Sequence, residues 1–257
     1  MIPVRLALLL AAALPLAACT PAATRPAAAI TDGEQLVRAM HDRYAGRWYN
    51  TLTFTQKTTR RLPNDSVRVE TWREYGAMPG RLRIEFGPRE NNNGVIYAND
   101  SSYVVRGGRV VARRPGRNAL MILGFDVYAL APEQSVRILR EEHFPMTPVR
   151  METYQGRPTW VVGGAPGDMH SHQFWVDAER LVYVRSFEPF AGDTTKTMDV
   201  RFDGYERFGG GWVSTVVDIL VDGRSIQKEE YSDVRVNVPL DPALWIPERW
   251  ADAPHPQ

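Results

Sequence analysis

The sequence predicts a mainly β (α+β) protein: a single incomplete antiparallel β-barrel, formed by a strongly curved sheet of about eleven strands, with helices acting as a lid or plug. Apolar and polar residues alternate with a period of two over many short stretches. Gly, Pro, Asn and Asp separate these stretches at the spacing typical of sequential hairpins. A sandwich of two sheets fits the same alternation, so the pattern alone leaves both architectures open.

The first element along the chain is a bacterial lipoprotein signal. Arg5 provides the positive charge, residues 6–14 form a short apolar run, and Ala17 and Ala18 are the small residues before a cleavage site. Cys19, the only cysteine, follows them, and we expect it to become the lipidated first residue of the mature protein. The apolar run is shorter than the roughly 20 residues that span a bilayer. An ordinary secretory signal, or a helix that stays in place, followed by a stray cysteine is the alternative.

Composition defines the domain organisation and excludes some partners. We expect a signal peptide at 1–18, the lipidated cysteine and an Ala/Pro/Thr-rich tether at 19–31, one domain at 32–250 and a tail at 251–257. The 31 basic residues balance 30 acidic ones, which gives no basic patch for nucleic acid. No cofactor is expected, and we expect a monomer.

An amphipathic helix opens the domain. Thr31 and Glu34 have the spacing of a capping box. Leu36, Met40 and Tyr44 follow at the four-residue spacing of one helix face. After this helix the hydrophobic period changes to two, so strands follow.

The strand-like stretches form two meanders on either side of residues 118–143. The stretches of the first meander lie near 50–60, 66–76, 81–87, 94–98, 102–106 and 109–114. Those of the second lie near 149–155, 158–164, 172–177, 181–188, 196–207, 212–222 and 224–236. Asp222-Gly223 is a strong two-residue hairpin signal within the second meander.

The interrupting segment contains the most hydrophobic run after the signal. Leu120, Ile122, Leu123 and Phe125 lie in this run, and a helical stretch with Pro near its start follows. The run could be an exposed apolar loop that enters a membrane. The alternative, which we favour, is a short helix that plugs the barrel, because exposing apolar surface is costly.

No catalytic or metal-binding motif is apparent. A Gly-x-Ser-x-Gly elbow, a Cys and His pairing and a phosphate loop are absent, so an enzyme is not expected. Glu70, Glu74 and Glu85 could pair as carboxylates, but acids on strand faces are most simply solvated surface. His170 and His172 have metal-like spacing, but Gly and Pro nearby place them in a loop. Because a site needs further ligands, no metal is expected.

Four short sequence segments resemble segments of the LolA/LolB-like superfamily of lipoprotein carriers and receptors. They are Met-Pro-Gly-Arg-Leu-Arg-Ile at 78–84, Gly-Val-Ile-Tyr-Ala-Asn-Asp at 94–100, Phe-Trp-Val-Asp at 174–177 and Tyr-Ser-Asp-Val-Arg-Val-Asn at 231–237. The order of lipoprotein signal, amphipathic helix, meander, helical interruption and second meander is similar to that superfamily too. The resemblance covers roughly residues 32–247.

The resemblance implies an unclosed barrel whose apolar cavity holds the acyl chains of a lipoprotein or another lipid, with helices as a lid. By this likeness Leu36, Met40 and Tyr44 would be the lid-helix face. The residues expected to line the inside are Leu52, Phe54, Leu82, Ile84, Phe86, Phe202 and Val217. Plain core packing is the alternative for each of them.

The predicted anchor separates this chain from the soluble carriers of the superfamily, because Cys19 would hold it at a membrane. Thr20 follows Cys19 in place of the Asp that marks inner-membrane retention in some bacteria, so the superfamily's logic favours the outer membrane, facing the periplasm. We therefore expect a lipid-anchored envelope protein that binds acyl chains for lipoprotein or lipid transport or localisation. The rival is an envelope sensor or scaffold of the same fold that binds a protein partner.

Overall fold

The computed structural model of the 257-residue chain describes residues 30–254. The predicted signal peptide, Cys19 and most of the tether lie outside the described residues. Within them, the protein consists of one large sheet, three α-helices and a few short 3-10 turns.

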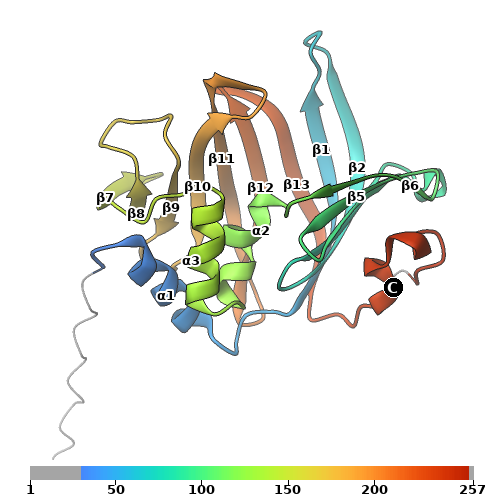
Figure 1. Cartoon of the computed structure of the whole chain (residues 1–257), viewed down its shortest axis with the longest axis horizontal. Coiled ribbons are helices and arrows are strands. Elements are labelled where there is room, and N and C mark those ends of the chain that lie inside the picture. The colour runs from blue at the N-terminus through green and yellow to red at the C-terminus, as the bar shows by residue number, and fades with distance from the viewer. Residues whose placement is uncertain (1–29, 255–257) are drawn as a thin grey trace, which may run out of the picture.

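One antiparallel sheet of 13 strands is the frame of the protein (Figure 1). Its strands are β1 (Thr51–Arg61), β2 (Val67–Ala77), β3 (Arg81–Phe86), β4 (Gly94–Ala98), β5 (Ser101–Arg106), β6 (Arg109–Pro115), β7 (Val149–Tyr154), β8 (Arg157–Gly163), β9 (Gln173–Asp177), β10 (Tyr183–Phe190), β11 (Asp193–Phe208), β12 (Gly211–Val221) and β13 (Arg224–Val236). The strands lie in the order β6-β5-β4-β3-β2-β1-β13-β12-β11-β10-β9-β8-β7.

This order confirms the predicted incomplete barrel and decides between the two architectures. The two meanders are joined edge to edge, because β1 pairs with β13. The sheet remains unclosed, since β6 and β7 are its two opposite edges (Figure 1). It has 13 strands where about eleven were expected, because each of the strand-like stretches in the sequence forms a strand.

Three helices cover one face of the sheet, which we call the inner face. They are α1 (Gly33–Tyr44), α2 (Ala119–Gly124) and α3 (Pro132–Glu141), and Figure 1 shows them in front of strands β10–β13. Their apolar sides join the main hydrophobic core together with the inner-face residues of these strands. Leu36 and Met40 of α1 and Leu139 of α3 are fully buried there.

The start of α1 differs from the predicted capping box by one residue. Asp32 is the N-cap, and its Oδ1 accepts a hydrogen bond from the Gln35 N–H at 2.8 Å. Gln35 Oε1 in turn accepts from the Thr31 N–H at 3.0 Å. The predicted partner Glu34 instead forms an ion pair with Arg140 of α3. The prediction was wrong because Asp and Gln supply the same capping groups one position later.

The outer face of the first meander is also covered, by the C-terminal segment 238–254. Trp250 of this segment is buried against Ile96 of β4, and its ring lies 3.8 Å from the Arg83 guanidinium. Arg83 Nε donates to Glu85 Oε1 at 2.9 Å, and both side chains are buried. The interpretation of Glu85 as solvated surface is therefore wrong, because strand alternation does not show which segment covers the polar face. Ala253 is buried too, so the packed part of the chain extends beyond residue 250.

Candidate ligand-binding pocket

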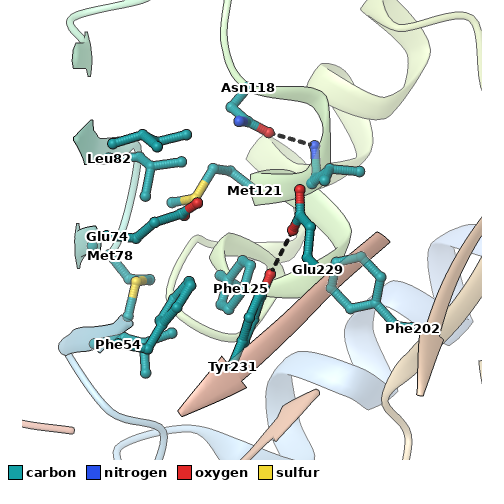
Figure 2. Close-up of a pocket in the computed structure, with 14 residues that line it drawn as sticks. Phe54, Glu74, Met78, Leu82, Asn118, Met121, Phe125, Phe202, Glu229 and Tyr231 are labelled. Carbon is teal, nitrogen blue, oxygen red and sulfur yellow. Dashed lines mark hydrogen bonds between the residues drawn. The ribbon is translucent and has the colours of Figure 1, made fainter. Parts of the chain in front are cut away.

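An apolar pocket lies on the inner face, between the β1–β3 hairpins, strand β13 and helix α2 (Figure 2). The pocket is narrow: about 50 Å³ of it is open to a water-sized sphere, and the figure reaches about 510 Å³ only when the open mouth is counted. Leu120, Met121 and Phe125, from α2 and the residue after it, form the roof. The pocket therefore lies between the sheet and the helical interruption.

Strand register explains the floor of the pocket. Leu52, Gly76 and Leu82 are aligned across β1, β2 and β3, and two residues further along Phe54, Glu74 and Ile84 form a second row. Because side chains two apart in a strand share a face, both rows point inward. Gly76 carries no side chain between the two leucines, and this leaves a hollow in the floor.

The structure brings seven of the residues singled out in the sequence to this pocket. They are Leu52, Phe54, Leu82, Ile84, Leu120, Phe125 and Phe202. The other seven lie elsewhere: Leu36, Met40, Tyr44, Val217, Ile122 and Leu123 are buried in the main core, and Phe86 is half-buried and packs against the smaller cluster around Trp72. Contact with a ligand stays a prediction for the first group. Ile122 and Leu123 of α2 are almost completely buried in this arrangement.

The roof segment is held at both ends by hydrogen bonds. Asn118 caps α2, with its Oδ1 accepting from the Leu120 N–H at 2.9 Å. Asp126 Oδ1 accepts from the Gly80 N–H at 3.0 Å and so ties the segment to the β2–β3 turn. Burial raises the pKa of Asp126 from 3.8 to about 7, despite the Gly80 hydrogen bond and the charge of Arg117, which lower it. An ionisable group thus lies beside the roof.

Two carboxyl groups enter the pocket from opposite walls (Figure 2). Glu74 of β2 is 7 % exposed and Glu229 of β13 is 6 % exposed. The pKa values of both are raised above the usual range, mainly because burial disfavours the charged form, and for Glu74 also because Glu229 is close. The interpretation of Glu74 as solvated surface is wrong, because its strand face turns into the pocket.

The two carboxyl groups differ in their hydrogen-bond partners. Glu229 accepts from Gln227 Nε2 at 2.6 Å and from the Tyr231 hydroxyl at 3.0 Å. Tyr231 is further fixed by its ring, which stacks on Phe54 with centroids 4.0 Å apart. Within residues 30–254, no hydrogen bond or ion pair joins Glu74 to another residue, and its carboxyl oxygens stay open to the pocket space. The two-residue spacing from Trp72 to Glu74 was the sequence signal that could have placed this acid inside.

The segment that contains His170 and His172 forms a turn. Asp168 Oδ1 accepts from the N–H groups of His170 at 2.8 Å and Ser171 at 3.0 Å, and these bonds help to hold the pKa of Asp168 at about 2. His170 Nδ1 lies 2.8 Å from Thr197 Oγ1. In the described part of the chain, no three His, Cys, Asp or Glu side chains are grouped to hold a metal ion. Between residues 30 and 254 the structure contains no helix of the length and apolarity needed to cross a membrane.

Three solved structures resemble this architecture over most of the chain. A DUF1329 family protein from Desulfovibrio piger has a TM-score of 0.55 at 15% identity, over 83% of this chain and 95% of its own. A putative outer membrane lipoprotein-sorting protein domain from Vibrio parahaemolyticus has a TM-score of 0.56 at 12% identity, over 85% and 98%. A LolA superfamily protein from Nitrosomonas europaea has a TM-score of 0.51 at 10% identity, over 81% and 96%.

The chain has the LolA-like fold. This confirms the resemblance seen in the sequence at the level of the fold. The sequence itself matches no family model and no curated protein. In this LolA-like chain, the pocket occupies the inner face of the unclosed sheet, under the helical interruption.

Proposed function

We propose that this chain is a lipid-anchored envelope protein that binds acyl chains of lipoproteins or lipids in the pocket under α2. Its role would be lipoprotein or lipid transport, or localisation at the outer membrane, with Cys19 as its anchor. The observation that supports the proposal is an apolar pocket enclosed between the sheet and a short helix. The similarity in fold to a putative outer membrane lipoprotein-sorting domain agrees with it.

The physical basis is the transfer of hydrocarbon out of water. Each CH₂ group that enters an apolar pocket gains about 0.8 kcal/mol, so a few methylenes give a useful affinity and still allow release. The pocket wall within residues 30–254 contains no Ser, Thr, Cys, Lys or His side chain. Its polar groups are the carboxyl groups of Glu74 and Glu229, the Tyr231 hydroxyl and the Asn118 amide, and the other lining residues are apolar.

Native mass spectrometry of the full chain, purified without detergent, tests this proposal. We expect a fatty species that stays bound and leaves when the gas-phase energy is raised. Leu120→Trp, which puts a large ring at the roof, should abolish the bound species. Arg137→Trp is the matched control, because Arg137 lies on the exposed side of α3, and it should retain the species.

A chain that carries no lipid in either form, while remaining folded by circular dichroism, would contradict the proposal. That result would favour the sensor or scaffold role, in which the same face binds a protein partner. Retention of the lipid by Leu120→Trp would show that the lipid binds outside this pocket.

A further inference from the structure

Glu74 is an isolated acceptor in an otherwise apolar pocket. Glu74 is only 7 % exposed, and its side chain points into the cavity (Figure 2). The donors of Gln227 and Tyr231 are engaged by Glu229. No Lys, Arg or His lies among the pocket-lining residues of the described chain. The remaining side-chain N–H donor among these lining residues is the Asn118 amide, and no hydrogen bond joins it to Glu74 in the described chain.

An unpaired carboxyl group in such a place is costly to the protein alone. A buried polar group without a hydrogen bond loses its hydration and gains nothing in return. A leucine or methionine at this position would continue the apolar row between Phe54 and Ile84. The cost is recovered when a bound molecule brings a donor, since hydrogen bonds to charged groups are the strong ones.

We propose that the pocket selects linear apolar chains whose polar end is a hydrogen-bond donor, an ammonium or amide N–H group, and that Glu74 accepts that donor. This inference rests on the proposed function, because it names the chemistry of the chain that the same pocket binds. Glu229 lies close by, and the nearness of the two carboxyl groups further disfavours the charged form of Glu74. A cationic donor would stabilise an ionised carboxyl group there, whereas the carboxylate of a free fatty acid would bring a third acidic group into the same space and is disfavoured.

The chemistry of N-acylated molecules fits this site. An acyl chain joined to an amine ends in an amide N–H, which a carboxyl group accepts, whereas an acyl ester has only acceptors at its end. An alkylammonium has the same donor with a full positive charge, and its binding would favour the ionised form of Glu74. Both the amide N–H and the ammonium group would donate to Glu74. Comparing the affinities of one probe of each kind shows which of the two the pocket prefers.

Calorimetric titration of the full chain, exchanged out of detergent, tests this selectivity at pH 7. The probes are dodecylammonium, N-dodecylacetamide, dodecyl acetate and dodecanoate, each kept below its micelle concentration. We expect the two donor probes to bind at least tenfold more tightly than dodecanoate, with dodecyl acetate in between. Glu74→Gln should reduce the ratio of dodecylammonium to dodecanoate affinity to within about threefold.

Glu230→Gln is the matched control, since Glu230 follows Glu229 on β13 but points outward to Lys57. It should leave the ratio unchanged. If Glu74→Gln does not fold, Glu74→Leu, which continues the apolar row, is the second variant and has the same expected result. Equal affinities for all four probes in the natural chain, or a ratio that survives both Glu74 variants, would overturn this inference and leave the proposed function standing. Binding of none of the probes would overturn both.

Discussion

Asp126→Asn should stabilise this protein at neutral pH and leave it nearly unchanged in acid. Asp126 is 3 % exposed, lies in the short turn after α2, and binds the Gly80 N–H through one carboxyl oxygen. Asn retains an oxygen for that hydrogen bond but cannot ionise. The substitution therefore removes the titration and keeps the contact that positions the roof of the pocket.

The sign follows from the raised pKa. Below about pH 4, Asp126 is protonated in both the folded and the unfolded chain, so ionisation contributes nothing to the free energy of unfolding. Between pH 4 and pH 7 the unfolded chain releases the proton and the folded chain keeps it, so the wild-type protein loses stability as pH rises. The difference between 3.8 and about 7 corresponds to about 4 kcal/mol, which is the full effect above pH 7.

Urea unfolding followed by tryptophan fluorescence at pH 4.5, 6 and 8 measures this effect. The free energy of unfolding of Asp126→Asn relative to wild type should increase by several kcal/mol across the series. Asp168→Asn is the control, because the pKa of Asp168 is held at about 2 by hydrogen bonds, so its difference from wild type should be constant from pH 5 to pH 8. A flat difference for Asp126→Asn as well would refute the reasoning.

Two further predictions concern packing. Gly94→Ala should cost about 1–3 kcal/mol of stability in urea unfolding, because a Cβ there would lie 2.0 Å from the Ile84 carbonyl oxygen and 2.4 Å from the Trp250 ring. The strand glycine Gly76 is its control, since a Cβ there meets nothing closer than 3.6 Å, and Gly76→Ala should change stability by less than about 1 kcal/mol. Equal losses of stability in the two variants would contradict the close packing of Trp250, in the C-terminal segment, against Gly94. Leu123→Asn should lower the free energy of unfolding by about 3–5 kcal/mol, because Leu123 is buried in the main core. Leu120→Asn should stay folded and bind dodecylammonium less tightly. A larger loss of stability in Leu120→Asn than in Leu123→Asn would contradict the placement of α2.

Much of the fold could be predicted because strand alternation is a local property. The period of two places Leu82 and Ile84 on one face of β3 whatever the chain does elsewhere. Turn residues such as Asp222 and Gly223 mark where a strand reverses. The likeness to the LolA-like fold lay in the order of such elements, so it was visible despite the low identities.

The pocket could be predicted only in part, because alternation cannot separate a cavity wall from packed core. Leu82 lines the pocket and Val217 lies in the main core, although both have the same pattern. The difference depends on what lies opposite: the six-residue helix α2 and the gap over Gly76 in one case, and the larger helices in the other. Helix placement depends on tertiary contacts such as the bond from Gly80 to Asp126.

By itself, the sequence determined that the chain forms strands with one apolar side, two meanders, and a helical interruption, since each follows from residues that are near neighbours. Tertiary structure decided where the charged residues of those strands lie. Glu74 and Glu229 meet in the pocket because β13 pairs with β1 and so lies one strand away from β2. Arg83 and Glu85 are buried because the C-terminal segment packs over them. The burial of a charge is a property of everything that packs around it, and this cannot be read from the spacing of residues along one strand.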